Sequence, residues 1–269
     1  MDRPRADVHA VALDIDGTLA GSDHRVSERT VLTVRSLTEL GVTPIIVTGR
    51  TARAARQLSD RIGLTSPIIS CNGAVVTDPT SDEHLMLSLI DPEMVSRIVT
   101  FGRKRDLDVI VWTVTEMIAD QRSAGTDLLE AVNEEPVTIS PLRASHPMDV
   151  VKVMLSGSPL ALDVAQDEIQ LSIPILQRSM DRFYESSNPG ATKKEALREV
   201  LRTIGVTGEQ CMGIADGDTD TGWLSDIGIA VAVSNAMESV LHMADIHIGH
   251  HSNDSVAAFL DSYFGLHHP

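Results

Sequence analysis

The chain has 269 residues, 42% of them hydrophobic, which suffices for one large domain or two modest ones with a sizeable core. A formal net charge of −16 without a basic stripe argues against a nucleic-acid partner, and no apolar run reaches the roughly 18 residues of a membrane span. The N-terminal segment lacks the apolar stretch of a signal peptide, and 2 cysteines make no disulfide framework, so we expect a cytoplasmic protein.

Residues 8–13 are almost continuously small and apolar, which predicts a strand buried on both faces of a parallel sheet. The strand runs into Asp14-Ile15-Asp16, and Gly17 then breaks it. Two carboxylates therefore lie at the carboxyl end of a buried strand, where open α/β sheets bind their ligands. Taken alone, this pattern is equally compatible with a solvated turn, because Asp is common in turns.

The following segments alternate between helix and strand. Ser27 is a suitable N-cap, and Gly41 and Gly63 are suitable helix ends. The order predicts a parallel, doubly wound, Rossmann-like sheet with right-handed crossovers. The expected elements are a helix over 27–40, a strand over 43–47, a helix over 51–62, and short strands over 67–70 and 74–77.

The pattern changes after the polar, turn-rich stretch 78–82, which is a candidate linker. Strand-like runs then mix with helices, two of which begin at Asp91-Pro92 and Ser158-Pro159. Trp112 and Met117 in this region are better explained by core packing than by substrate contact. After a second linker at 187–190, the alternation resumes with helices over 192–204, 219–225, 236–243 and 252–263, and strands over 210–214, 227–231 and 245–248.

These shifts predict two domains within an α/β chain. A Rossmann-like core is expected over residues 1–80 and 187–269, built from both ends of the chain. An α+β cap domain is expected as an insertion over residues 81–186.

Two segments offer anion-binding groups at helix starts. Thr48-Gly49-Arg50 supplies a hydroxyl and backbone N–H groups, although a plain strand-to-helix turn with Thr48 as cap is the alternative. The run from Thr192 to Glu195 reads as a capping box that puts Lys193 and Lys194 in the first helical turn. A cation is unfavourable there unless an anion lies between it and the helix, so Lys193 is a candidate phosphate ligand; a solvated turn suits Lys194 better.

A third segment, Ala215-Asp216-Gly217-Asp218-Thr219-Asp220, places acids after another apolar run. It lacks the Gly and Glu positions of a calcium-binding EF-hand loop. Neighbouring parallel strands lie about 4.8 Å apart, so acids at their ends converge. Several carboxylates share a site only if they protonate or bind a cation, and an all-oxygen donor set favours Mg²⁺. A carboxylate-held Mg²⁺ beside Lys and Thr suits a phosphate monoester.

Taken in order, these motifs resemble those of the haloacid dehalogenase-like phosphohydrolases. The matching pieces are DIDGT at 14–18, TGR at 48–50, the lysine that opens a helix after a linker, and DGDTD at 216–220. Asn72-Gly73-Ala74 and Asn235-Ala236 are similar to landmarks of the Cof-type subgroup, whose large α/β cap lies between the second and third motifs. The resemblance covers nearly the whole chain.

The resemblance implies a mechanism and a set of roles. Asp14 would form an aspartyl-phosphate, and Asp16 would act as general acid and base. Phosphate would be held by Thr48, Gly49, Lys193 and Thr219, and substrate also by Arg50 and Asn72. Mg²⁺ would be bound by Asp14, the carbonyl oxygen of Asp16, Asp216 and Asp220.

Two positions depart from the family pattern. Ala215 stands where the family usually has Gly, which is tolerable at negative φ, and Thr219 stands where it usually has Asn. We expect weaker phosphate binding or a small rearrangement, with Asp218 taking part.

The sequence therefore predicts a cytoplasmic, Mg²⁺-dependent phosphatase for a small phosphorylated metabolite such as a sugar phosphate, pyridoxal phosphate or flavin mononucleotide. Neither a nucleic acid nor a membrane is expected as a partner. A phosphomutase of the same superfamily and a non-catalytic phosphometabolite-binding protein are the alternatives.

Overall fold

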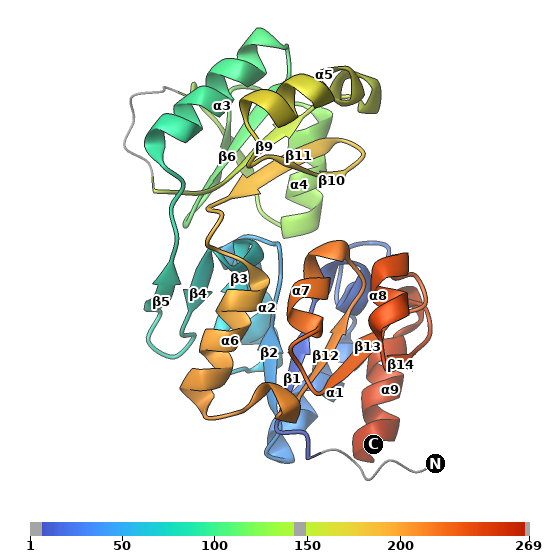
Figure 1. The fold of residues 1–269 in the computed structure, drawn as a ribbon. Coiled ribbons are helices and arrows are strands. Elements are labelled where there is room, and N and C mark those ends of the chain that lie inside the picture. The colour runs from blue at the N-terminus through green and yellow to red at the C-terminus, as the bar shows by residue number, and fades with distance from the viewer. Residues whose placement is uncertain (1–6, 143–148, 267–269) are drawn as a thin grey trace.

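The computed structural model describes residues 7–142 and 149–266, and the molecule divides into two halves (Figure 1). The lower half is built on a parallel five-stranded sheet of order β14-β13-β12-β1-β2. Its strands are β1 (Ala10–Leu13), β2 (Thr43–Ile46), β12 (Cys211–Ala215), β13 (Ile229–Ala232) and β14 (Ile246–His247). The expected α/β core, assembled from both ends of the chain, is confirmed.

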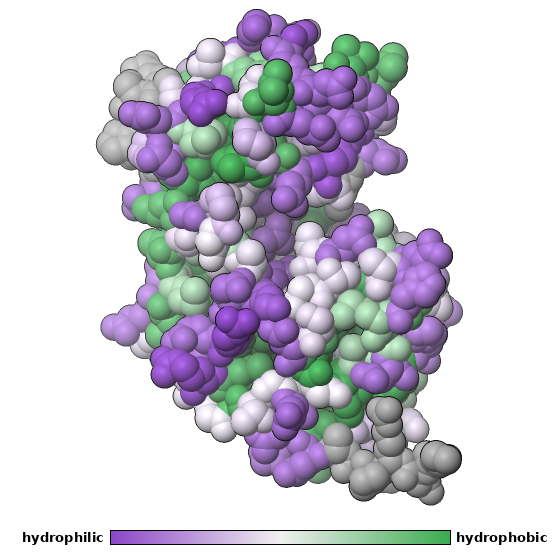
Figure 2. All heavy atoms as spheres, in the orientation of Figure 1, coloured by the Kyte–Doolittle hydropathy of each residue, from purple (hydrophilic) through white to green (hydrophobic). Residues whose placement is uncertain are grey.

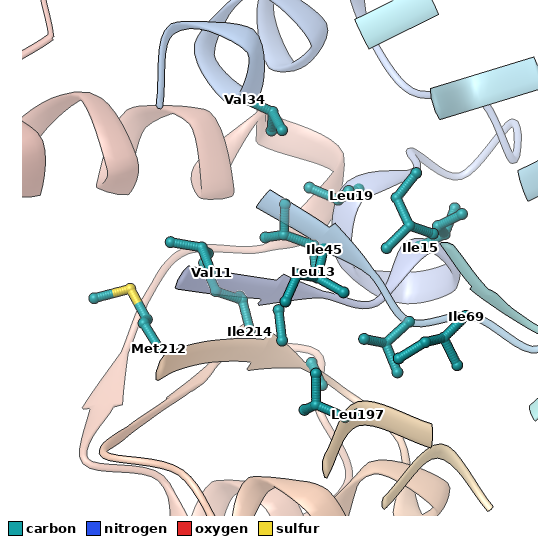
Figure 3. Packing of buried hydrophobic residues seen from close by; sticks show 14 of the residues in the cluster. Val11, Leu13, Ile15, Leu19, Val34, Ile45, Ile69, Leu197, Met212 and Ile214 are labelled. Atoms are coloured by element: carbon teal, nitrogen blue, oxygen red, sulfur yellow. The ribbon is translucent and has the colours of Figure 1, made fainter. Parts of the chain in front are cut away.

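Helices cover both faces of this sheet. The close view shows Val34 of α1 on one side of the strands and Leu197 of α6 on the other, with Leu13 and Ile45 between them (Figure 3). Every residue of β1 is completely buried, as its continuous apolar sequence requires. The helices are α1 (Glu28–Glu39), α2 (Ala52–Ile62), α6 (Lys193–Ile204), α7 (Thr221–Leu224), α8 (Glu238–Met243) and α9 (Ser255–Phe264).

Short polar side chains define where these helices begin. Ser27, Thr51 and Thr192 each accept a hydrogen bond from the backbone N–H three residues later. Gly63 and Gly205 end α2 and α6 in left-handed conformations. Thr51, rather than Thr48, therefore caps α2.

The two short strands predicted after α2 are present, but the prediction that they continue the parallel sheet is wrong. β3 (Ile68–Ser70) meets the core sheet through a parallel bridge between Ile69 and Val47. It then pairs antiparallel with β4 (Val75–Thr77), which pairs antiparallel with β5 (His84–Leu87). Three successive residues with positive φ, Cys71, Asn72 and Gly73, reverse the chain between β3 and β4.

The stretch 78–82 is consequently the turn of a hairpin between β4 and β5, closed by the Asp78 N–H donating to Glu83 O. We therefore propose to begin the inserted segment after β5 rather than at residue 81. The outermost residues of the proposed core, 1–6 and 267–269, lie outside the described residues.

A six-stranded sheet forms the upper half, with the order β10-β11-β9-β6-β7-β8. Its strands are β6 (Asp108–Thr113), β7 (Met117–Ala119), β8 (Val137–Ile139), β9 (Val150–Ser156), β10 (Gln177–Met180) and β11 (Phe183–Ser187), and its helices are α3 (Pro92–Lys104), α4 (Ala124–Asn133) and α5 (Pro159–Ser172). Asp91 and Ser158 cap α3 and α5 ahead of a proline, as predicted. We call this part, residues 92–187, the upper half throughout.

The two halves are joined by two crossing segments and by an apolar contact. Where the chain enters and leaves the upper half, the Asn188 side-chain amide donates to Leu89 O at 2.9 Å. The Asn133 Oδ1 atom of α4 accepts the Thr51 N–H at 2.9 Å. One buried apolar cluster spans the junction and contains Cys71, Ala74 and Val75 from below with Trp112, Met117 and Phe183 from above. Among the described residues, no helix is long and apolar enough to cross a membrane.

Candidate active site

Three neighbouring strands deliver the predicted site residues to one edge of the core sheet. Asp14 follows β1, Thr48 follows β2 on one side, and Asp216 follows β12 on the other. Because parallel strands share their carboxyl edge, these groups meet where open α/β sheets bind ligands. Hydrophilic residues are exposed at the indentation between the two halves (Figure 2).

Lys193, at the start of α6, lies between two of the carboxylates. Its Nζ is 2.7 Å from Asp14 Oδ1 and 2.7 Å from Asp220 Oδ1. The Trp223 indole N–H also donates to Asp220 Oδ1, at 2.8 Å, and the Gly217 N–H donates to Asp220 Oδ2 at 3.3 Å. Asp14, Asp220 and Lys193 are all at most 5% exposed. The lysine and its two acids thus form a fixed, buried unit.

Asp216 is held against the turn that follows β1. Thr18 donates to Asp216 Oδ1 at 3.0 Å. Gly17 has a φ of +77°, and a Cβ there would lie 2.3 Å from Asp216 Oδ2, so only glycine fits this turn. The Asn235 amide fixes the same turn by donating to Gly17 O at 2.8 Å.

The electrostatics of the cluster are unbalanced. Burial raises the pKa of Asp14 well above its usual range, and the charges of Asp220 and Asp216 add to the effect while Lys193 opposes it. Burial also raises the pKa of Asp216 to about 6. Burial would lower the pKa of Lys193, but the adjacent Asp14 and Asp220 outweigh it and the pKa is raised. One ammonium shared by two acids cannot neutralise three.

The residues present fit a divalent cation. Asp14, Asp216 and Asp220 each offer a carboxylate oxygen, and the three oxygens lie within 4.8 Å of one another. Three carboxylates and one ammonium leave two excess negative charges, which a divalent ion balances. An oxygen-only donor set is the kind that hard cations such as Mg²⁺ prefer.

Asp16, the second predicted acid, points away from this cluster toward Arg50. The Arg50 Nη2 donates to Asp16 Oδ1 at 2.7 Å and its Nε to Asp16 Oδ2 at 3.0 Å. The same Nη2 also donates to His24 O at 2.7 Å. Arg50 is only 5% exposed, and this bidentate pair fixes the orientation of the Asp16 carboxylate.

The Thr48-Gly49 turn and Asn72 lie side by side. Thr48 is completely buried, and its Oγ1 accepts the Arg50 N–H at 3.1 Å. A Cβ on Gly49 would lie 2.7 Å from Asn72 Oδ1, so the amide packs directly on the glycine. Gly73 in turn packs on the start of α6, because a Cβ there would lie 2.3 Å from Thr192 O. These contacts connect the phosphate-site candidates of β2 and α6.

The two departures from the family pattern have different outcomes. Ala215 is the last residue of β12, is completely buried and does not have a positive φ, so its methyl group is accommodated. Thr219 is exposed, and the carboxylate of Asp218 accepts a hydrogen bond from Ser239.

Lys194 forms a partly exposed ion pair with Asp226 at 3.0 Å, as the solvated-turn alternative expects.

Sequence reasoning missed several polar residues around the site. The structure adds Trp223 and Thr18, which bind the acids, and a pair from the upper half, Lys152 and Glu185, that lies over Gly49 and Asn72. A usable signal was present for Lys152, because a lysine inside the apolar run 150–155 must find a polar partner when that run is buried. Glu185 carried none, since it lies in a mixed polar segment.

Comparisons with known proteins agree with the fold. The family model for haloacid dehalogenase-like hydrolases matches residues 11–260. The 5-amino-6-(5-phospho-D-ribitylamino)uracil phosphatase YitU of Bacillus subtilis (strain 168) is 27% identical over 271 residues, covering 96% of this chain and 98% of that protein. The HMP-PP phosphatase of Cronobacter sakazakii is 26% identical and covers 96% of each chain.

A solved haloacid dehalogenase-like hydrolase from Bacteroides thetaiotaomicron has the same fold, with a TM-score of 0.87 and 23% identity over 95% of this chain and 99% of that one. The chain belongs to the haloacid dehalogenase-like hydrolases, and the predicted resemblance is confirmed.

Proposed function

We propose that the chain is a Mg²⁺-dependent phosphatase that hydrolyses a small phosphorylated metabolite through an aspartyl-phosphate. The single observation that carries the proposal is the largely buried cluster of Asp14, Asp216 and Asp220. Lys193 lies within hydrogen-bond distance of Asp14 and Asp220. The relatives named above are phosphatases for small metabolites, which supports the same reaction here.

The proposed roles are those that the family resemblance implies, and the contacts of the site support them. Asp14 attacks phosphorus, and the Lys193 ammonium, which bonds Asp14 Oδ1, stabilises negative charge on the phosphoryl oxygens. Thr48, the Gly49 backbone and Thr219 are proposed as further phosphate ligands. Asp16 would protonate the leaving alcohol and then deprotonate the attacking water, with Arg50 orienting its carboxylate.

Mg²⁺ would be held by Asp14, Asp216, Asp220 and the carbonyl oxygen of Asp16. When bound, it supplies positive charge that draws the substrate dianion toward Asp14. The upper half would act as a cap that limits access to small substrates and excludes bulk water. Both cysteines are buried free thiols, which supports a reducing, cytoplasmic setting.

The test is release of inorganic phosphate from phenyl phosphate with Mg²⁺. We expect the wild-type protein to turn it over and Asp14→Asn to lose at least about a thousandfold in kcat, because the amide cannot act as the nucleophile. Asp226→Asn, at a surface ion pair with Lys194 and Arg198, is the control and should keep wild-type turnover. An active Asp14→Asn protein would contradict the proposal.

Absence of turnover in the wild-type protein would favour the non-catalytic binding alternative. A requirement for a bisphosphate activator would instead indicate the phosphomutase, which returns the phosphoryl group to its substrate.

A further inference from the structure

Trp223 connects the acid cluster with a strand of the core sheet. The residue lies in α7, beside α6, and is 1% exposed (Figure 1). A Cβ on Gly213 of β12 would lie 2.4 Å from Trp223 Cζ3, so the ring packs directly on the glycine. The indole N–H donates to Asp220 Oδ1 at 2.8 Å. The ring is therefore fixed between the strand that leads to Asp216 and the carboxylate of Asp220.

The orientation of the Asp220 carboxylate depends on side chains of α6 and α7. Asp220 precedes α7, but its carboxylate accepts no capping hydrogen bond from the described N–H groups of that helix. Its Oδ1 instead accepts from the Lys193 ammonium at 2.7 Å and from the Trp223 indole at 2.8 Å. The Gly217 N–H reaches Oδ2 at the longer distance of 3.3 Å. Loss of a side-chain donor should therefore free the carboxylate to turn.

The donors are shared unequally between the two oxygens of Asp220. A carboxylate oxygen has two lone pairs, so two donors use the acceptor capacity of Oδ1, whereas one donor leaves a lone pair on Oδ2. This lone pair is the one that Asp220 can offer to a cation shared with Asp14 and Asp216. With Trp223 in place, Oδ2 is thus the oxygen left for the ion.

Lys193 is the less constant of the two donors to Asp220 Oδ1. Its ammonium already donates to Asp14 and Asp220, and the phosphoryl oxygens of a substrate compete for the same N–H groups. Its flexible four-carbon stem lets the ammonium follow the substrate. The indole of Trp223 lacks this freedom, because its ring packs on Gly213. Trp223 is therefore the donor that remains on Asp220 when the lysine engages phosphate.

We propose that Trp223 is a positioning residue for the divalent cation: it holds Oδ1 of Asp220 so that Oδ2 stays available to the ion while Lys193 serves the substrate. This inference rests on the proposed phosphatase function and concerns the cation of the same site. Trp223 acts through Asp220, so its removal should weaken Mg²⁺ binding and leave the chemical step intact once the ion is bound.

Calorimetric titration with Mg²⁺, without substrate, compares the wild type with Trp223→Phe and Trp112→Phe. The chain has 2 tryptophans, both almost completely buried, and each substitution keeps a ring and removes an indole N–H. The Trp112 N–H has no partner within the described part of the chain, which makes Trp112→Phe the matched control. We expect the Kd for Mg²⁺ to rise at least about tenfold in Trp223→Phe and to stay within about twofold of the wild-type value in Trp112→Phe.

A second measurement separates positioning from misfolding. With phenyl phosphate, Trp223→Phe should need about tenfold more Mg²⁺ for half-maximal turnover, and saturating Mg²⁺ should restore kcat to within about threefold of the wild-type value. KM for the ester should change little. A misfolded site would not recover on addition of the ion. The melting temperature of each metal-free variant is measured beside its kinetics.

Three results would overturn Trp223 as a positioning residue while leaving the phosphatase and its metal site intact. They are an unchanged Kd for Mg²⁺ in Trp223→Phe, an equal rise in both variants, and a loss of kcat that saturating Mg²⁺ does not restore. A wild-type protein that binds no Mg²⁺ and releases no phosphate would overturn the proposed function itself.

Discussion

At the scale of single residues, the two tryptophans offer a direct comparison. The Trp223 indole donates to Asp220 Oδ1, whereas the Trp112 indole N–H has no partner among the described residues. Both rings are at most 2% exposed. The indole N–H therefore stabilises a carboxylate at Trp223 and has no acceptor at Trp112 within the described part of the chain.

Replacing each tryptophan with phenylalanine should separate these roles. Both substitutions remove similar volume, but Trp223→Phe also takes a hydrogen bond from a buried carboxylate, while Trp112→Phe removes an unmet donor. We expect Trp223→Phe to lower the free energy of unfolding by about 1–3 kcal/mol more than Trp112→Phe. Urea denaturation measures both values, and equal losses would contradict the assignment.

The raised pKa of Asp216 predicts how metal binding depends on pH. In the metal-free protein, the folded state holds the Asp216 proton up to about pH 6, while the unfolded chain releases it near 3.8. Its contribution to stability is therefore present below that lower value and lost as the pH rises through about 6. A bound cation must displace the proton.

We accordingly expect the apparent Mg²⁺ affinity to fall by at least about tenfold per pH unit below pH 6, because Asp216, and Asp14 with its raised pKa, must lose their protons to bind the ion. The gain in melting temperature on adding Mg²⁺ should be larger at pH 7.5 than at pH 5. Calorimetric titration at several pH values measures the affinity. Asp216→Asn should bind the ion more weakly and with a flatter pH profile; an unchanged profile would count against Asp216 as a ligand.

At the scale of elements, the turn of Cys71, Asn72 and Gly73 positions more than its own strand. It reverses the chain into β4, and Gly73 packs on the backbone that begins α6, the helix carrying Lys193. A short turn therefore helps to fix the distance between the lysine and the strand ends.

Gly73→Ala should be far more costly than an alanine at another left-handed glycine. Gly205 has a φ of +72° with nothing within 4 Å of its Cβ position, so Gly205→Ala should cost about 1–2 kcal/mol from backbone strain. Gly73, with a φ of +95° and Thr192 O at 2.3 Å, should cost about 1–3 kcal/mol more. Thermal unfolding measures the loss of stability in both variants. Similar losses would show that the start of α6 moves aside without cost and would contradict the prediction.

Elements with strong local signals were predictable, and those set by distant contacts were not. Helix starts could be predicted from their N-cap residues, because capping is a local interaction. These residues are Ser27, Asp91, Ser158 and Thr192. The direction of β4 was missed because it depends on positive φ at Cys71 and Asn72, which sequence patterns rarely reveal. Strand β7 was missed because it has only 3 residues and is defined by its pairing with β6 and β8.

The candidate site likewise has a part that the sequence predicted and a part that it did not. The convergence of Asp14, Asp216, Asp220 and Lys193 followed from placing acids and a helix start at one sheet edge. The pairing of Arg50 with Asp16, and the position of Lys152 over Gly49, depend on how long side chains cross between elements.

At the scale of the whole molecule, the contact between the halves combines an apolar cluster with polar contacts, one of which is a helix cap. Asn133 Oδ1 accepts the Thr51 N–H, so a residue of the upper half completes the start of α2. Its amide nitrogen also donates to Leu129 O at 2.9 Å, which fixes its orientation. A buried amide of the upper half is thus one of the polar contacts that join the two halves.

Asn133→Ala should loosen the junction without unfolding either half. The Thr51 amide loses its acceptor, so we expect its hydrogen exchange to quicken by about tenfold, with faster exchange also at Cys71 and Val75. Mass spectrometry of deuterium uptake measures this. Thr138→Ala, which removes a hydrogen bond to Glu116 within the upper half, is the control, and identical uptake in both variants would refute the role.

The hydrogen bond between Asn188 and Leu89 brings the start and the finish of the inserted segment together. The core therefore meets the inserted segment at two neighbouring points, whatever the length of that segment. The inserted segment could therefore become longer or shorter, or be replaced, during evolution without moving the catalytic acids apart. Related proteins could in this way keep the same reaction and change their substrate.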